Sequence, residues 1–148
     1  MEQDERTVVR QAQNVVQQSL REHGRVLPGA VILAHHHPDS GEPLPAPAAL
    51  AMSEDKPFED EAAFELFVGG LRAETRRLGA TAIALIGEAG AEVEGSEGVR
   101  RVALIRMEDR GGVQLLHAPI EPQPDGGVLA GDFVASPEAP DILEHPIL

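Results

Sequence analysis

The sequence contains no cysteine, no tryptophan and no tyrosine, and apart from histidine its only aromatic side chains are four phenylalanines. The absence of cysteine excludes disulfides, thiolate metal sites and thiol nucleophiles. The scarcity of aromatic rings removes the stacking platforms on which proteins bind single-stranded nucleic acid. No apolar run approaches the roughly 18 residues of a membrane span. We therefore expect neither nucleic acid nor a membrane as a partner.

Positive charge is also scarce. The chain has 12 Lys and Arg residues against 25 Asp and Glu residues, which gives a formal net charge of −13 at pH 7. Lys56 is the only lysine, and the arginines are spread along the chain. Because nucleic acids and anionic lipids are bound by concentrated basic patches, this charge balance again argues against both partners.

The first residues, Met1–Arg6, are acidic and polar. They lack the basic and apolar regions of a secretory signal peptide. The absence of cysteine suits a reducing compartment, although it would suit an oxidising one as well. The simplest expected localisation is cytoplasmic.

A length of 148 residues fits one domain, and apolar residues make up 42% of the chain, which is enough for a folded core. We expect a single α+β domain over residues 1–136, followed by a proline-rich C-terminal tail over residues 137–148. The core is light and rich in alanine. Such a core would gain from burying further surface in an oligomer, so we expect a homodimer.

Two segments have the period of amphipathic helices. Residues 5–23 place apolar side chains on one face and end at Gly24, where a C-cap is expected. Residues 57–78 begin with Pro57, and their apolar stripe consists of Phe64, Phe67, Val68, Leu71 and Leu78. Gly69–Gly70 lie inside this second helix at a cost in stability, which close approach of another backbone would offset.

Strand patterns occupy most of the remaining chain. They cover residues 26–36, 48–52, 80–86, 99–107 and 113–120, with a last short strand within 128–134 and a hairpin turn at 109–112. The predicted fold is α+β, with two helices packed on a mainly antiparallel sheet of about five strands in the order αββαβββ. The helices would cover one face together or one face each.

A run of three histidines ends the first predicted strand. Side chains alternate along a strand, so His35 and His37 would point the same way, with Asp39 just beyond. These groups could hold a divalent metal, with His117 from a separate strand as a third nitrogen ligand. Glu88 would serve as a carboxylate base. The sequence thus offers a candidate metal–water hydrolase site.

The alternative interpretation is that the histidines form a solvated surface stretch, because Pro38 marks the exit of the strand. The His-x-His-Pro start is similar to the motif of JAMM metalloproteases, which also needs a Ser and an Asp that residues 41–49 do not supply. The His-x-His-x-Asp spacing is similar to that of metallo-β-lactamase-type hydrolases, in which another His follows the Asp. Ser40 stands there instead. Both resemblances fail at residues that carry the chemistry.

Other site patterns are absent. The glycines at 87, 90, 95 and 98 fit neither the dinucleotide fingerprint nor the Walker loop, and neighbouring glutamates would repel phosphate. No serine lies in a Gly-x-Ser-x-Gly elbow. The acidic residues between 54 and 65 lack the spacing of a calcium loop.

Three functions follow from these patterns. The first is a non-enzymatic module that acts through protein contacts, as a homodimer or with another protein partner, and needs no cofactor. The second is a small hydrolase that uses a divalent metal at the histidine cluster. The third is a small-ligand sensor whose pocket lies between helix 57–78 and the sheet, which a preformed apolar pocket would favour.

Overall fold

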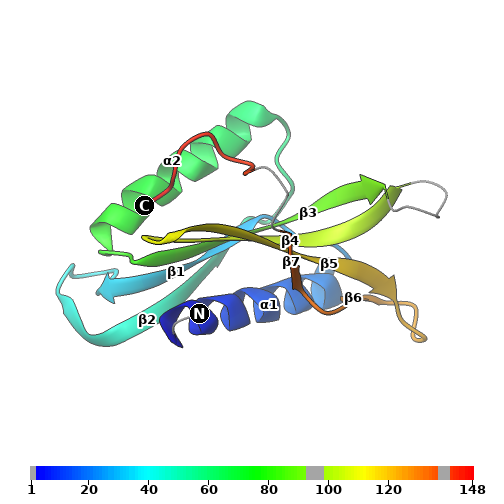
Figure 1. Cartoon of the computed structure of the whole chain (residues 1–148), viewed down its shortest axis with the longest axis horizontal. Helices are drawn as coiled ribbons and strands as arrows, with labels where there is room; N and C mark the ends of the chain where they lie inside the picture. Colours follow the sequence, from blue (N-terminus) through cyan, green and yellow to red (C-terminus); the bar gives the residue numbers. More distant parts are fainter. Residues whose placement is uncertain (1–2, 93–98, 137–140) are drawn as a thin grey trace.

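The computed structural model describes residues 3–92, 99–136 and 141–148 (Figure 1). In this part of the chain two helices pack on one mostly antiparallel sheet, so the predicted α+β class is confirmed. The elements are α1 (Gln3–His23), β1 (Gly29–His36), β2 (Pro43–Ser53), α2 (Glu61–Arg77), β3 (Ala82–Glu92), β4 (Val99–Asp109), β5 (Gly112–Pro122), β6 (Val128–Ala130) and β7 (Val134–Ala135). Neither helix is long and apolar enough, over the described residues, to cross a bilayer.

The sheet has seven strands rather than the predicted five, and five strands rather than three follow α2. The single short strand expected within residues 128–134 is replaced by two strands, β6 and β7, of three and two residues, which are too short to show a pattern of alternating side chains. The spatial order is β2-β1-β3-β4-β5-β6, with β7 also paired to β5. The prediction of about five strands was therefore wrong in number, and the element order differs after β5.

Strand β2 is longer than the predicted segment 48–52 and includes three alternating prolines, at positions 43, 45 and 47. Proline has no backbone N–H and is excluded from the middle of a sheet. The strand tolerates these residues because it lies at the edge and pairs only with β1. The same prolines limit pairing of this edge with another strand.

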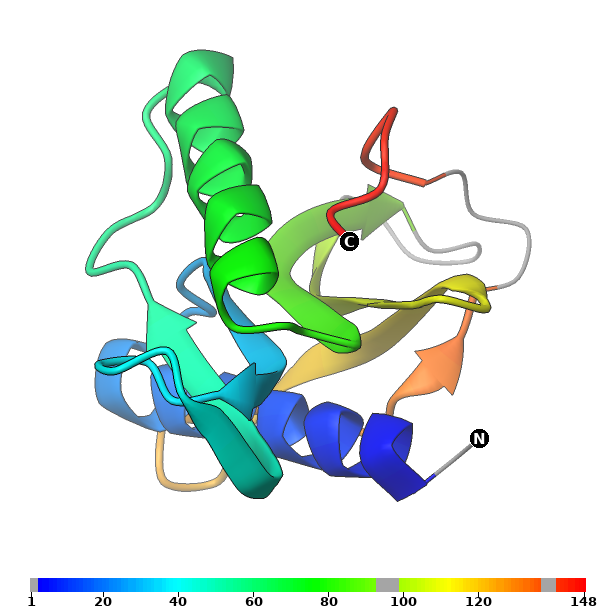
Figure 2. The same ribbon diagram turned by 90° about the vertical axis from the view of Figure 1, so that its left-hand side faces the viewer.

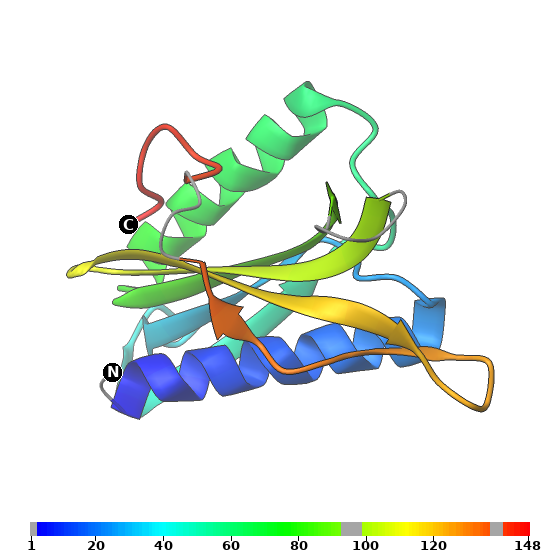
Figure 3. The same ribbon diagram turned by 45° about the vertical axis from the view of Figure 1, so that its right-hand side comes forward.

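One helix covers each face of the sheet, which is one of the two predicted arrangements (Figures 1 and 2). Strand β1 is buried on both sides because its residues alternate between two cores. Val31 and Leu33 pack in the core under α1, whereas Ile32 packs in the core under α2. Strand β6 lies alongside α1 (Figure 3), where the Gln17 side chain exchanges two hydrogen bonds with the backbone of Ala130, at 2.9 and 3.0 Å.

The C-terminal residues 141–148 pack on the same face of the sheet as α2. Ile147 is only 3% exposed and belongs to the core under α2. The carboxylate of Glu108 accepts hydrogen bonds from the backbone N–H groups of Ile147 and Leu148, at 2.9 and 2.6 Å. This part of the predicted tail is therefore hydrogen-bonded to strand β4.

Gly79 follows α2 and has a left-handed φ of +59°. A Cβ at this position would also collide with the ring of His36. We expect Gly79→Ala to lower the free energy of unfolding by about 2–3 kcal/mol, from the left-handed backbone and the collision together. Gly24→Ala is the matched control, because Gly24 has a φ of +72° and open space around it, so only the backbone cost of about 1–2 kcal/mol remains. Urea denaturation measures both losses, and equal losses would contradict the contact with His36.

Candidate functional site

The three histidines among the predicted metal ligands have different local partners. His35 Nε2 lies 2.9 Å from the hydroxyl of Thr81. His37 is exposed, and its Nδ1 accepts a hydrogen bond from the backbone N–H of Asp39 at 3.2 Å. His117 Nδ1 contacts the hydroxyl of Ser136.

The predicted third nitrogen ligand is remote from the others. His117 lies on β5, and strands β3 and β4 separate β5 from β1. Three strand spacings of about 4.8 Å amount to roughly 14 Å, far beyond the reach of one metal ion. No group of three His, Asp or Glu side chains is placed to hold a metal ion in the described segments. The structure therefore does not bring the four predicted ligands together.

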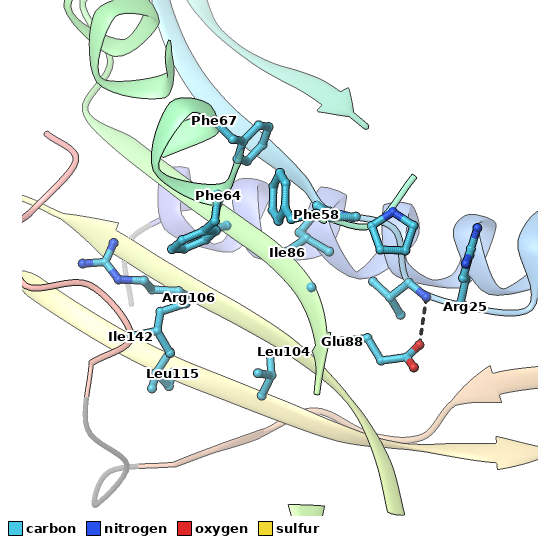
Figure 4. Close-up of a pocket in the computed structure, with 15 residues that line it drawn as sticks. Arg25, Phe58, Phe64, Phe67, Ile86, Glu88, Leu104, Arg106, Leu115 and Ile142 are labelled. Carbon is cyan, nitrogen blue, oxygen red and sulfur yellow. Dashed lines mark hydrogen bonds between the residues drawn. The ribbon is translucent and has the colours of Figure 1, made fainter. Parts of the chain in front are cut away.

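A half-open cavity of about 420 Å³ lies between the start of α2 and the sheet (Figure 4). It occupies the place where the sequence predicted the pocket of a ligand sensor. Its lining residues are mainly apolar: Arg25, Val26, Pro28, Pro57, Phe58, Phe64, Phe67, Leu85, Ile86, Gly87, Glu88, Leu104, Arg106, Leu115 and Ile142. The cavity thus draws on segments from both halves of the chain.

Three of the four phenylalanines form one wall of this cavity. The ring centroid of Phe58 lies 5.6 Å from that of Phe64 and 5.3 Å from that of Phe67, with the rings tilted against each other. Asp60 fixes the start of α2, because its side chain accepts a hydrogen bond from the backbone N–H of Ala63 at 2.8 Å. The spacing of three residues then places Phe64 and Phe67 on the same side of the helix.

The opposite wall comes from three neighbouring strands. Leu104 on β4 pairs in register with Gly87 on β3, and Leu115 on β5 pairs with Arg106 on β4. A Cβ on Gly87 would meet no atom within 4 Å. The missing side chain at this position is therefore part of what leaves the cavity open.

Glu88 lies at one end of the cavity in Figure 4. Its carboxylate accepts hydrogen bonds from Nε and Nη2 of Arg101, at 2.9 and 2.8 Å, and from the backbone N–H of Val26 at 3.0 Å. Burial would raise the pKa of Glu88, but these hydrogen bonds outweigh burial and leave its pKa below the ordinary value. The group is therefore a paired carboxylate anion at neutral pH.

Arg106 lies at the other end and is 1% exposed. Its Nε and Nη2 donate to the carboxylate of Asp141 at 2.6 and 2.9 Å, and its Nη1 donates to Glu108 at 2.5 Å. The hydrogen bonds from Arg106 are the largest cause that lowers the pKa of Asp141. Both carboxylates that pair with the Arg106 guanidinium thus belong to the protein itself.

The buried polar groups of the cavity are accordingly satisfied. Over the described residues, no buried side-chain nitrogen or oxygen lacks a hydrogen-bond partner. Among the residues that the structure describes, the lining contains no serine or histidine, and Glu88 is its only carboxylate. The geometry presents apolar surface to a ligand and offers no nucleophile with an adjacent base.

The chain matches no protein-family model, no curated protein and no solved structure. The sequence signal for the cavity was the position of the phenylalanines at the start of the second helix. No local signal pointed to Gly87, Leu104 or Leu115 as its other wall, since they meet only through strand pairing.

Proposed function

We propose that this protein is a non-enzymatic binding module that holds an uncharged, apolar small molecule between α2 and the sheet. The observation that supports this function best is the open cavity itself, with its aromatic wall and its paired polar ends. Its volume of about 420 Å³ falls within the range of small-molecule sites, roughly 300–1,000 Å³.

The charge state of the ligand follows from the partners of the polar groups. A charged ligand buried in the cavity would need an opposite charge to offset the loss of its hydration. Glu88 is already paired with Arg101, and Arg106 is already paired with Asp141 and Glu108. The third charged lining residue, Arg25, is exposed to water and its charge acts on Glu88. The net charge of −13 adds repulsion against anions. An uncharged molecule with a ring or a compact hydrocarbon body fits these walls.

Fluorescence titration tests this function. Nile red, which is uncharged and emits strongly in apolar surroundings, is expected to bind with saturation at one molecule per chain. An anionic naphthalene sulfonate probe is expected to bind at least about tenfold more weakly, because Arg106 is already paired and the other lining cation, Arg25, is exposed to water and already acts on the Glu88 carboxylate. The chain has no tryptophan or tyrosine, so protein emission does not interfere. Nile red emission that rises without saturation would contradict the proposal.

A further inference from the structure

The side of α2 that faces away from the sheet carries an exposed apolar stripe. Leu66 is 79% exposed, the largest value among the exposed large hydrophobic residues described. Ala62, Gly69 and Ala73 are also exposed, and their spacing of three or four residues from Leu66 and from one another places them on the same side of the helix. We call these four residues the outer stripe of α2. Val68 and Leu71, by contrast, point into the core.

Nothing within the described chain requires glycine at two positions of this helix. A Cβ on Gly69 or Gly70 would meet nothing within 4 Å, and neither residue has a left-handed φ. Glycine inside a helix is unfavourable, because it loses more backbone freedom than any other residue. A reason for glycine at this position is the close approach of a second backbone from outside.

Opposite charges lie on either side of the glycines. Glu65 and Arg76 are exposed and stand 11 residues apart, which is close to three helical turns, so they flank the outer stripe on the same side. Neither side chain makes a hydrogen bond or an ion pair with another residue in the described segments. The glycines lie near the midpoint between them.

We propose that two copies of this chain pair through the outer stripe, with their α2 helices antiparallel and Gly69–Gly70 at the crossing point. A two-fold axis that passes through this point, perpendicular to both helices, makes the second helix run in the opposite direction. It also places the same flank of both helices on the same side of the pair. Glu65 of one copy then lies opposite Arg76 of the other, and the second such pair follows by symmetry. The stripe is thus complementary to itself in shape and in charge, which identifies the occupant as a second copy.

The cavity and the outer stripe lie on opposite sides of α2, so this dimer leaves the ligand site accessible. One pair of helices forms a small interface, and small interfaces are typical of weak, reversible association. We therefore expect a dimer that dissociates on dilution.

Charge reversal tests the pairing. Sedimentation velocity over a concentration series is expected to show monomer–dimer exchange for the unaltered chain. Glu65→Arg and Arg76→Glu are each expected to raise the dissociation constant about tenfold, because each sets two like-charge pairs across the interface. The double variant E65R/R76E is expected to return it to near the starting value. This rescue must act between copies, because 11 residues at 1.5 Å each keep the two side chains about 16 Å apart within one helix.

Arg110→Glu is the matched control. Arg110 is exposed on the turn between β4 and β5, and its reversal changes the net charge by the same amount as Arg76→Glu. The control is expected to leave the dissociation constant unchanged, and circular dichroism checks that every variant keeps its helices. A chain that stays monomeric at every concentration would overturn the proposal. So would a dimer in which the two reversals weaken association additively, without rescue in the double variant.

Discussion

Replacing Arg106 with leucine is expected to lower the free energy of unfolding by about 3–5 kcal/mol, because it leaves a buried carboxylate without its cation. Glu108 is 2% exposed and would be left buried beside an apolar side chain. Asp141 would lose both of its hydrogen bonds from the guanidinium, at 2.6 and 2.9 Å. The substitution is therefore expected to destabilise both the core and the packing of the C-terminal residues.

Arg101→Leu is the matched control for this effect. Arg101 also forms a doubly hydrogen-bonded ion pair, with Glu88, but its side chain is 43% exposed. An exposed pair of this kind contributes about 0–1 kcal/mol. Urea denaturation measures both variants, and hydrogen exchange at the amides of Ile147 and Leu148 reports whether the C-terminal residues detach. Similar losses for the two variants would contradict the role assigned to burial.

Replacing Gly87 with leucine is expected to abolish binding of Nile red, with a loss in affinity of at least about 100-fold. Gly87 lies in a regular strand without a positive φ, and its Cβ would enter open space inside the cavity. Leucine therefore fills the volume that the ligand would occupy. Because glycine weakens strands, the free energy of unfolding is expected to stay level or to rise by up to about 1 kcal/mol.

Gly70→Leu is the control for this variant. Gly70 also has open space around it, but it lies on α2 and outside the cavity lining. It is expected to leave Nile red binding unchanged, even where it alters association of the chains. Fluorescence titration of the three proteins, with denaturation to check folding, gives the comparison. Retained binding in Gly87→Leu would place the ligand site elsewhere.

The sequence predicted the elements whose signals are local. Both helices have a clear period of apolar residues, and the glycines at 24 and 79 mark where each of them ends. The apolar run from Val31 to Ala34 indicated a strand, and the structure shows in addition that its residues alternate between the two cores. The pocket between the second helix and the sheet, one of three alternatives, lies where the structure has its cavity.

Features that depend on distant residues were missed. Residues 88–92 have the composition of a loop, yet β3 continues through them because each one pairs with a residue of β4. Arg106 and Glu108 alternate with apolar residues and so resemble the solvated face of a strand. They are buried because the C-terminal residues, more than 30 positions away, cover them. His117 was expected to converge with His35 from a separate strand although the strand order was open, and the structure places β3 and β4 between their two strands.

The most direct test of the central claim is an NMR titration of isotope-labelled protein with an uncharged apolar ligand such as Nile red. The proposed function predicts that the largest shift changes fall on the backbone amide of Gly87 and on the methyl groups of Leu104 and Leu115, which line the cavity from three strands. Little change is expected at Leu66 on the far side of α2. Shift changes centred on Leu66, or spread evenly over the surface, would contradict binding in the cavity.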